Sequence, residues 1–307
     1  MEKPVQRNKY LGTVVSRRRF GALTLALAGA RLVPAGPSKE KRWRMRLSTS
    51  TLHFADLPLE EACAKIAAQG FEAVDIWSAF AGCKHLDYAV DKLKAEGLRR
   101  LLSEKKLKLF SFSVYKGGYR KYAAFLGECG GGVAVRGSTR PCKPKELTAR
   151  MRAFLESLKP LAELAERYNS YIAIENHGRA LLDSLDSFKA FVDLNSSPRI
   201  GIALAPFHLQ GIGASVTEAI EIAGKQLFFF YAWQRGRGVK QLPGWGPTDF
   251  TPWIEALARV GYKGCVNPFM HGHLPPDVMA AALGRARSYL LKCAAKAGVA
   301  ACGSDRS

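Results

Sequence analysis

The chain has 307 residues, 48% of them hydrophobic, and a formal net charge of +20. This length fits one α/β barrel or two smaller domains. Seven cysteines without a C-x-x-C pair exclude a disulfide scaffold and a zinc knuckle. Residues 1–46 hold 12 Lys/Arg against two acidic residues, so half of the net charge lies in this short segment and the remaining chain is only modestly basic. Such a surface attracts anionic substrates or envelope lipids as readily as nucleic acid.

The N-terminal segment has the order of an export signal. Ser16-Arg17-Arg18-Arg19-Phe20 precedes an apolar run, Ala22 to Ala30, that ends in small residues. The arginine pair resembles the twin-arginine motif, and the apolar run is shorter than the ~20 residues of a membrane span. We therefore expect a disordered signal peptide at 1–36, a linker at 37–45, and a mature protein without a membrane span in the periplasm or cell envelope.

Eight short β-rich runs alternate with helical stretches after the linker. Their apolar character is typical of parallel strands buried on both faces. Eight such alternations favour a closed barrel over an open sheet. The sequence predicts a single (β/α)₈ TIM barrel at 46–297 and a flexible tail at 298–307. The expected strands are Arg46–Ser50, Ala73–Trp77, Leu107–Val114, Gly132–Arg136, Tyr171–Glu175, Ile200–Leu204, Leu227–Ala232 and Gly264–Asn267.

The helical stretches carry recognisable boundaries. Helices are expected at Leu57–Gln69, with Gly70 as its end, and at Glu146–Arg167, where Pro160 predicts a kink or two shorter helices. Ser215 begins a capping box, and Asp249 is an expected N-cap for Phe250–Val260. A last helix is expected at Pro276–Ala295. No GxGxxG follows the first strand, so nothing indicates a dinucleotide site.

The histidines are not scattered over the chain. All six lie at the end of an expected strand or in the loop after one, and these ends and loops form the active-site face of a TIM barrel. The pattern therefore predicts the site at this face. The residues are His53, His85, His177, His208, His271 and His273.

Several segments together resemble the xylose-isomerase-like sugar phosphate isomerase/epimerase superfamily. Gly70–Ile76 is similar to its second strand, Ile174–His177 to its fifth, Gly201–His208 to its sixth, and Asp249–Gly264 to its seventh helix and the turn into strand eight. The resemblance spans roughly residues 46–295 and implies the barrel fold. It also implies a divalent cation held by Glu, Asp, His and Glu after strands five to eight, which polarises a substrate oxygen during proton transfer.

Only one of these four ligands has its counterpart here. Glu175 is kept, whereas Ala205 stands in place of the Asp and Asn267 in place of the last Glu. The run Phe228–Gln234 contains no histidine. The family's usual oxygen-rich site is therefore not expected in this chain.

Three readings of the site remain open. Glu175, His208, His271 and His273 could form a rebuilt site for a metal such as Zn²⁺. Alternatively, Glu175 could act as a base without a metal, with His208 or His177 as its acid partner. The third reading is a barrel that kept the fold and lost its chemistry.

Further residues are candidates for substrate binding. Asp75, His53, His85 and Asn267 could contact hydroxyl groups, although each could equally be structural. Trp233 could stack on a sugar face or wall the pocket. Arg235 and Arg237 follow the seventh strand, where barrels frequently bind phosphate, and predict a site for an anionic group.

The leading interpretation is a divergent sugar isomerase/epimerase-like protein that acts on a carbohydrate or a sugar acid. The alternative is a non-catalytic carbohydrate-binding barrel. An endonuclease IV-like nuclease is disfavoured, because its zinc cluster needs many ligands that are missing here, and nucleic acid is not an expected partner. The sequence does not define the substrate or the oligomeric state.

Overall fold

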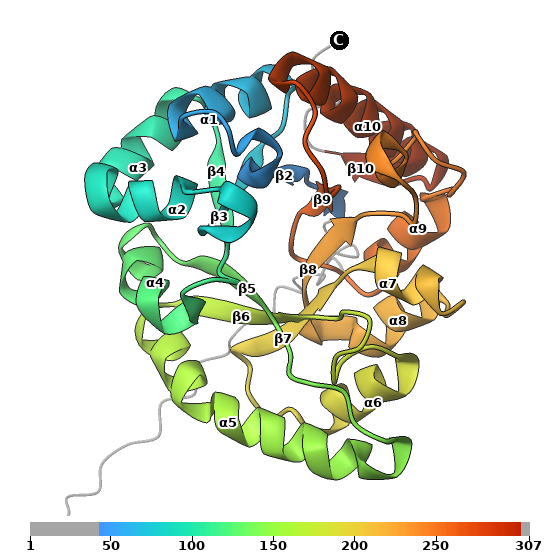
Figure 1. The fold of residues 1–307 in the computed structure, drawn as a ribbon. Helices are drawn as coiled ribbons and strands as arrows, with labels where there is room; N and C mark the ends of the chain where they lie inside the picture. The colour runs from blue at the N-terminus through green and yellow to red at the C-terminus, as the bar shows by residue number, and fades with distance from the viewer. Residues whose placement is uncertain (1–42, 302–307) are drawn as a thin grey trace, which may run out of the picture. The chain divides into compact units, whose positions relative to one another are not determined.

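The computed structural model describes residues 43–301, and all of them belong to one unit of the chain, Lys41–Ser307. The expected export signal lies outside the described residues. Eight parallel strands form one sheet in the order β2-β3-β4-β5-β6-β7-β8-β9. A parallel bridge between Leu47 and Val266, just before β2 and at the start of β9, joins the two edges of the sheet. The predicted (β/α)₈ barrel is therefore confirmed (Figure 1).

The strand positions agree closely with the periodicity of the sequence. Three strands, β3, β7 and β8, have the predicted bounds, and the others differ by one or two residues at an end. Most of these runs are apolar enough to be buried on both faces, whereas β2 consists of three buried polar residues, Ser48, Thr49 and Ser50. The barrel strands are β2 (Ser48–Ser50), β3 (Ala73–Trp77), β4 (Lys108–Ser113), β5 (Gly132–Gly137), β6 (Ser170–Glu175), β7 (Ile200–Leu204), β8 (Leu227–Ala232) and β9 (Val266–Pro268).

Helices follow the strands and lie outside them (Figure 1). Among the described residues, no helix is long and apolar enough to cross a membrane. The helices are α1 (Leu59–Ala68), α2 (His85–Tyr88), α3 (Lys94–Glu104), α4 (Gly118–Glu128), α5 (Leu147–Arg167), α6 (Leu185–Leu194), α7 (Pro206–Gly211), α8 (Val216–Ala223), α9 (Thr251–Arg259) and α10 (Pro276–Lys296).

Two of the helix boundaries predicted from the sequence differ from those in the structure. Pro160 lies within the single helix α5 and does not divide it. Its ring is on the exposed side of the helix, where water can bond the carbonyl that Pro160 leaves without an N–H donor. Ser215 caps α8 as predicted, accepting a bond from the Glu218 amide. Asp249 bonds the Thr251 amide at 2.9 Å, but α9 begins one residue later than expected.

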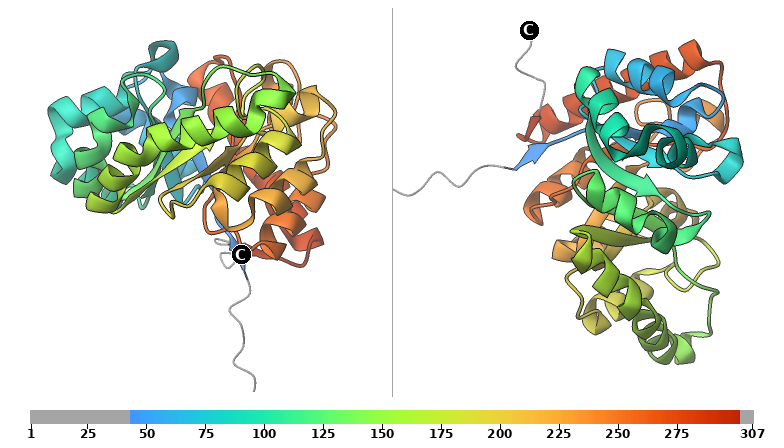
Figure 2. Two further views of the ribbon diagram at one scale, coloured as in Figure 1. Left: turned by 90° about the horizontal axis from the view of Figure 1, so that it is seen from below. Right: turned by 90° about the vertical axis from the view of Figure 1, so that its left-hand side faces the viewer.

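The ends of the described chain pair with each other. β1 (Arg44–Met45) lies parallel to β10 (Ala300–Ala301), as Figure 2 shows from the side. The expected linker and flexible tail therefore each contribute residues to a small two-stranded sheet. Met45 and Ala301 are buried there, which supplies the apolar contact that a free tail would lack.

Alternation along the strands creates two apolar layers. Outward-facing residues such as Val74, Ile76 and Ile174 pack against the helices. Inward-facing residues such as Ala173 and Phe229 fill the barrel interior. This alternation of period two also directs the polar residues at the strand ends into the barrel mouth.

Candidate active site

Glu175 ends β6 inside the barrel, and only 7% of it is exposed. The hydroxyl group of Tyr115 donates to its Oε2 at 2.6 Å, and this hydroxyl lies 3.2 Å from that of Tyr231. Burial raises the pKa of Glu175 to about 7, although the bond from Tyr115 and the nearby His177 favour the carboxylate. A carboxyl group with this pKa exchanges a proton readily near neutral pH.

Asp75 lies in the buried polar centre of the barrel and is not exposed at the barrel mouth. It is fully buried and accepts hydrogen bonds from Ser50 and Ser111 at 2.8 Å, from Ser113 at 2.9 and 3.0 Å, and from the Trp77 indole at 2.5 Å. Burial raises its pKa to about 6, against these bonds. Its oxygens are thus occupied by the protein, which makes Asp75 a structural acceptor.

Asn267 belongs to the same buried network. Its amide nitrogen donates to Ser50 at 3.0 Å, and its oxygen accepts from Ser48 at 3.3 Å. The side chain has no exposed surface. The amide therefore links β9 to β2 at the seam of the barrel, instead of facing a substrate.

His177 and His208 form a close pair at the ends of β6 and β7. Their ring centroids are 4.0 Å apart. His177 Nδ1 lies 2.8 Å from the Gly178 carbonyl, which can only accept, so this nitrogen carries a proton. Burial and the neighbouring His177, His271 and Arg235 lower the pKa of His208 to about 3, which keeps it neutral. Its Nε2 is buried and has no hydrogen-bond partner among the described residues.

Trp233 is the centre of an aromatic wall beside this pair. It stacks on Phe207 with centroids 4.3 Å apart and planes 13° apart, and its indole nitrogen donates to Gln241 at 2.9 Å. His208 and His271 meet the indole edge-on at 5.2 and 5.0 Å. Trp233 itself is buried, so Phe207, which is partly exposed, is the ring that a ligand would meet.

Only one of the two arginines after β8 lies against this wall. The Arg235 guanidinium is 5.9 Å from the Phe207 ring, and its backbone amide donates to Gln210 at 2.7 Å. A side chain at Gly211 would collide with it, since an added Cβ would lie 2.6 Å from the guanidinium. Arg237 is exposed on the following loop. Both arginines are exposed, and the structure places Arg235 beside Phe207 and His208.

His53 and His85 have structural partners. The Met270 amide donates to His53 Nε2 at 3.2 Å, so its Nδ1 bears the proton and faces Thr49 at 3.2 Å. Burial lowers the pKa of His53 to about 3, so it stays neutral. His85 is held between the Leu57 carbonyl at 2.8 Å and the Cys83 thiol at 3.3 Å. Neither is available as the predicted ligand for sugar hydroxyls.

The four residues of the expected rebuilt metal site are not assembled as a ligand set. Glu175 is engaged by Tyr115, and His271 packs edge-on against Trp233 and Phe269. His271 and His273 are both exposed on the loop after β9. Within residues 43–301, no group of three or more His, Cys, Asp or Glu side chains is placed to hold an ion. The family's ligand set does not fit either, because Ala205 is a buried methyl and Asn267 is enclosed by serines.

The hydroxyl groups around the carboxyl groups of Glu175 and Asp75 were not among the residues predicted from the sequence. Tyr115 directly follows the predicted third strand, so the rule that strand ends build the site could have found it. Tyr231 lies inside an apolar run, where it is indistinguishable from core aromatics. The three serines that bond Asp75 carried no signal, because only strand register brings them together.

The fold and the position of this site define a TIM barrel with its polar centre at the carboxyl ends of the strands. Residues 63–289 match the family model described as xylose isomerase-like TIM barrel, and the chain belongs to this family. No curated protein sequence matches it.

Solved structures share the fold at low sequence identity. The 3-keto-D-glucoside 4-epimerase from E. coli is 16% identical with a TM-score of 0.61, over 80% of this chain and all of that one. D-psicose 3-epimerase is 16% identical with a TM-score of 0.62, over 83% and 100%. A probable 3-DHS dehydratase from Bacillus anthracis is 14% identical with a TM-score of 0.63, over 80% and 99%.

Proposed function

We propose that this protein is a divergent sugar isomerase or epimerase that moves a proton on a carbohydrate or sugar acid, with Glu175 as the base. The observation that carries the proposal is the buried Glu175 carboxyl, whose pKa burial raises to about 7. Structural neighbours that include two sugar epimerases support this substrate class.

In the proposed reaction, the Glu175 carboxylate takes the proton from the carbon next to a substrate carbonyl. The electron pair of the broken C–H bond moves to form an enediolate. In an isomerisation, Glu175 returns the proton to the neighbouring carbon while the hydroxyl proton of the enediolate passes to the other oxygen. In an epimerisation, a water molecule protonates the opposite face of the same carbon, and the resulting hydroxide takes the proton from Glu175. Tyr115 holds the carboxylate in place and remains protonated, because burial and Glu175 raise its pKa well above the usual value.

His208 is proposed to bind the substrate oxygen. Its neutral imidazole has a buried Nε2 without a partner, and a hydrogen bond to a ligand oxygen would remove the cost of leaving that atom unsatisfied. A neutral imidazole can polarise a carbonyl without giving up its proton completely. His177 lies against the same ring and would fix its orientation.

Deuterium exchange tests this proposal. Incubation with a panel of ketoses, keto-glucosides and sugar acids in D₂O would introduce deuterium at the carbon next to the carbonyl, detected by NMR. We expect exchange with at least one ligand by the wild type and none by Glu175→Gln. Binding without exchange would instead support the second candidate, a non-catalytic carbohydrate-binding barrel, which Ala205 and the enclosed Asn267 favour.

We also propose export through the twin-arginine-type signal at residues 1–36, with the mature protein in the periplasm or cell envelope. Ser16-Arg17-Arg18-Arg19-Phe20 supports this proposal. Substitution of Arg17 and Arg18 by Lys should keep the protein in the cytoplasm on cell fractionation. Arg19→Lys is the matched control and should be exported normally. Export of both variants would contradict the proposal.

A further inference from the structure

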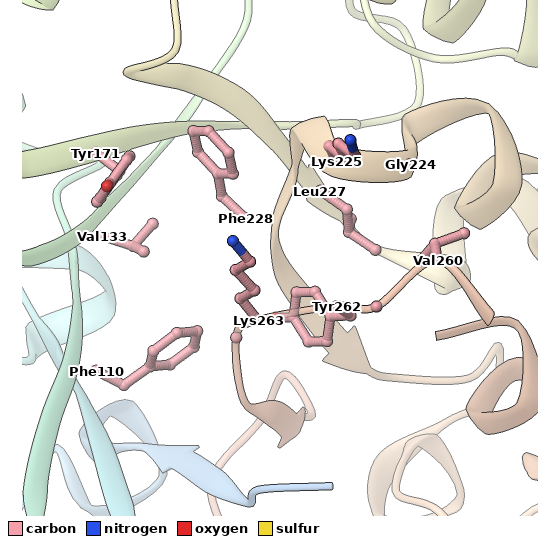
Figure 3. A pocket seen from close by; sticks show the side chains of 12 residues that line it. Phe110, Val133, Tyr171, Gly224, Lys225, Leu227, Phe228, Val260, Tyr262 and Lys263 are labelled. Carbon is pink, nitrogen blue, oxygen red and sulfur yellow. The ribbon is translucent and has the colours of Figure 1, made fainter. Parts of the chain in front are cut away.

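A pocket lies at the end of the barrel opposite the candidate active site. Its volume is about 670 Å³, within the ~300–1,000 Å³ of typical small-molecule sites. Its walls come from the starts of β4, β5, β6 and β8 and from the turn before β9 (Figure 3). The apolar side chains that line it include Phe110, Val133, Leu227, Phe228 and Val260.

The pocket is apolar inside and basic at its edge. Lys263 extends its ammonium group between Phe228 and Phe110 in Figure 3, and Lys225 lies at the rim. Among the described residues, no carboxylate lines the pocket. Arg46 donates to the Lys263 carbonyl, and the Arg199 guanidinium lies 4.8 Å from the Tyr171 ring on the same side. Arg199 is paired with Glu166 at 2.5 Å, so the positive charge at this opening comes mainly from Lys225 and Lys263, with no acidic group among the described lining residues.

This combination defines the chemistry of the occupant. An apolar wall favours an aliphatic chain, because transferring each CH₂ group from water increases the binding constant about fourfold. An ammonium group at the opening favours a carboxylate over a neutral head group. We propose that the pocket binds a single-chain fatty acid, with its chain against Phe110, Val133 and Phe228 and its carboxylate at Lys263. The site does not depend on the proposed sugar chemistry.

The first measurement is calorimetric titration of the full chain with octanoate, decanoate and dodecanoate. Each two-carbon extension should tighten binding about fifteenfold, because it buries two further CH₂ groups. Dodecanol should bind about fivefold more weakly than dodecanoate, since it lacks the charge. Equal affinity for all three acids, or no binding below millimolar concentration, would overturn the proposal.

Variants locate the binding site. Lys263→Gln should weaken dodecanoate about fivefold and leave dodecanol unchanged. Lys145→Gln, the same change on the exposed segment before α5, is the matched control and should alter neither. Val133→Phe should fill part of the cavity and weaken both ligands by tenfold or more, with the fold checked by circular dichroism. Unchanged dodecanoate affinity in Lys263→Gln and in a folded Val133→Phe would contradict the assignment.

The alternative occupant of the pocket is a second copy of this chain, and light scattering distinguishes it from a fatty acid. If the wild type is a dimer by light scattering and Val133→Phe is a monomer, the apolar surface is a subunit contact and the proposal fails. A wild type whose oligomeric state does not change with Val133→Phe, and which binds dodecanoate, supports it.

Discussion

The hydroxyl group of Tyr115 donates a 2.6 Å hydrogen bond to Oε2 of Glu175 inside the barrel mouth. A hydrogen bond to the ionised form stabilises the carboxylate, whereas burial destabilises it. Burial has the larger effect, so the pKa of Glu175 is raised to about 7. This pair therefore controls how much of the proposed base is available at neutral pH.

Removal of the Tyr115 hydroxyl should raise the pKa of Glu175 further. We expect Tyr115→Phe to move the titration midpoint upward by roughly one pH unit, since a buried hydrogen bond to a charged group contributes about 1.5–3 kcal/mol and water can replace part of it. Carbon-13 NMR of the labelled Glu carboxyls measures this midpoint. Tyr88→Phe is the control, because Tyr88 makes the same kind of bond to Glu60 on the surface. A midpoint for Glu175 that stays the same or falls would contradict the account.

Glu175 should destabilise the folded protein above neutral pH. Its pKa is about 7 in the folded state against an ordinary 4.5, so the folded state binds more protons between these values. Its contribution to stability is therefore fully present below pH 4.5 and is lost as the pH rises through about 7. Glu175→Gln should raise the free energy of unfolding by about 1–3 kcal/mol at pH 8 and by much less at pH 5. Urea titrations at the two pH values measure this, and equal effects at both would refute it.

Asp75 should be important for stability because it is the common acceptor of three serines and Trp77. We expect Asp75→Ala to cost roughly 2–4 kcal/mol, since it leaves buried donors without a partner. Asp56→Ala, on an exposed loop, is the control and should change stability by less than about 0.5 kcal/mol. Thermal or urea unfolding measures the change in stability of both variants. A loss below 1 kcal/mol in Asp75→Ala would show that the serines find other partners.

The two arginines after β8 should differ in their effect on anionic ligands. Both side chains are exposed, but of the two only Arg235 lies beside Phe207 and His208. Arg235→Ala should weaken the binding of sugar acids or sugar phosphates about three- to tenfold and spare neutral sugars, and Arg237→Ala should have little effect. Calorimetric titration with a charged sugar and its neutral counterpart tests this. Equal losses in both variants would place the anionic group elsewhere.

Most of the strands were predictable because they depend on a local apolar run, and β3, β7 and β8 have the expected bounds. The position of Glu175 followed from the same pattern, since it ends a strand. The hydrogen-bond partners of Asp75 and Asn267 could not be predicted in this way, because they come from other strands that only the barrel's register brings close. β10 was missed because two alanines have no pattern of their own, and only pairing with Arg44–Met45 orders them.

The arrangement of the histidines was also only partly predictable from the sequence. Their placement near strand ends predicted that they lie at the carboxyl end of the barrel, but sequence spacing could not show which rings meet. His177 follows β6 and His208 lies in α7, and their ring centroids are 4.0 Å apart, whereas His53 and His85 are fixed by backbone groups. Contacts across the barrel, rather than local sequence, therefore decide which histidine rings meet.

The central claim is that Glu175 moves a proton without the four-ligand metal site of the family. The most direct measurement is the rate of solvent deuterium exchange into a bound keto sugar before and after treatment with a chelator, followed by addition of Mn²⁺. The account predicts the same Glu175-dependent rate under all three conditions. Exchange that disappears with the chelator and returns with Mn²⁺ would contradict it, and would show that the side chains rearrange to hold a metal during the reaction.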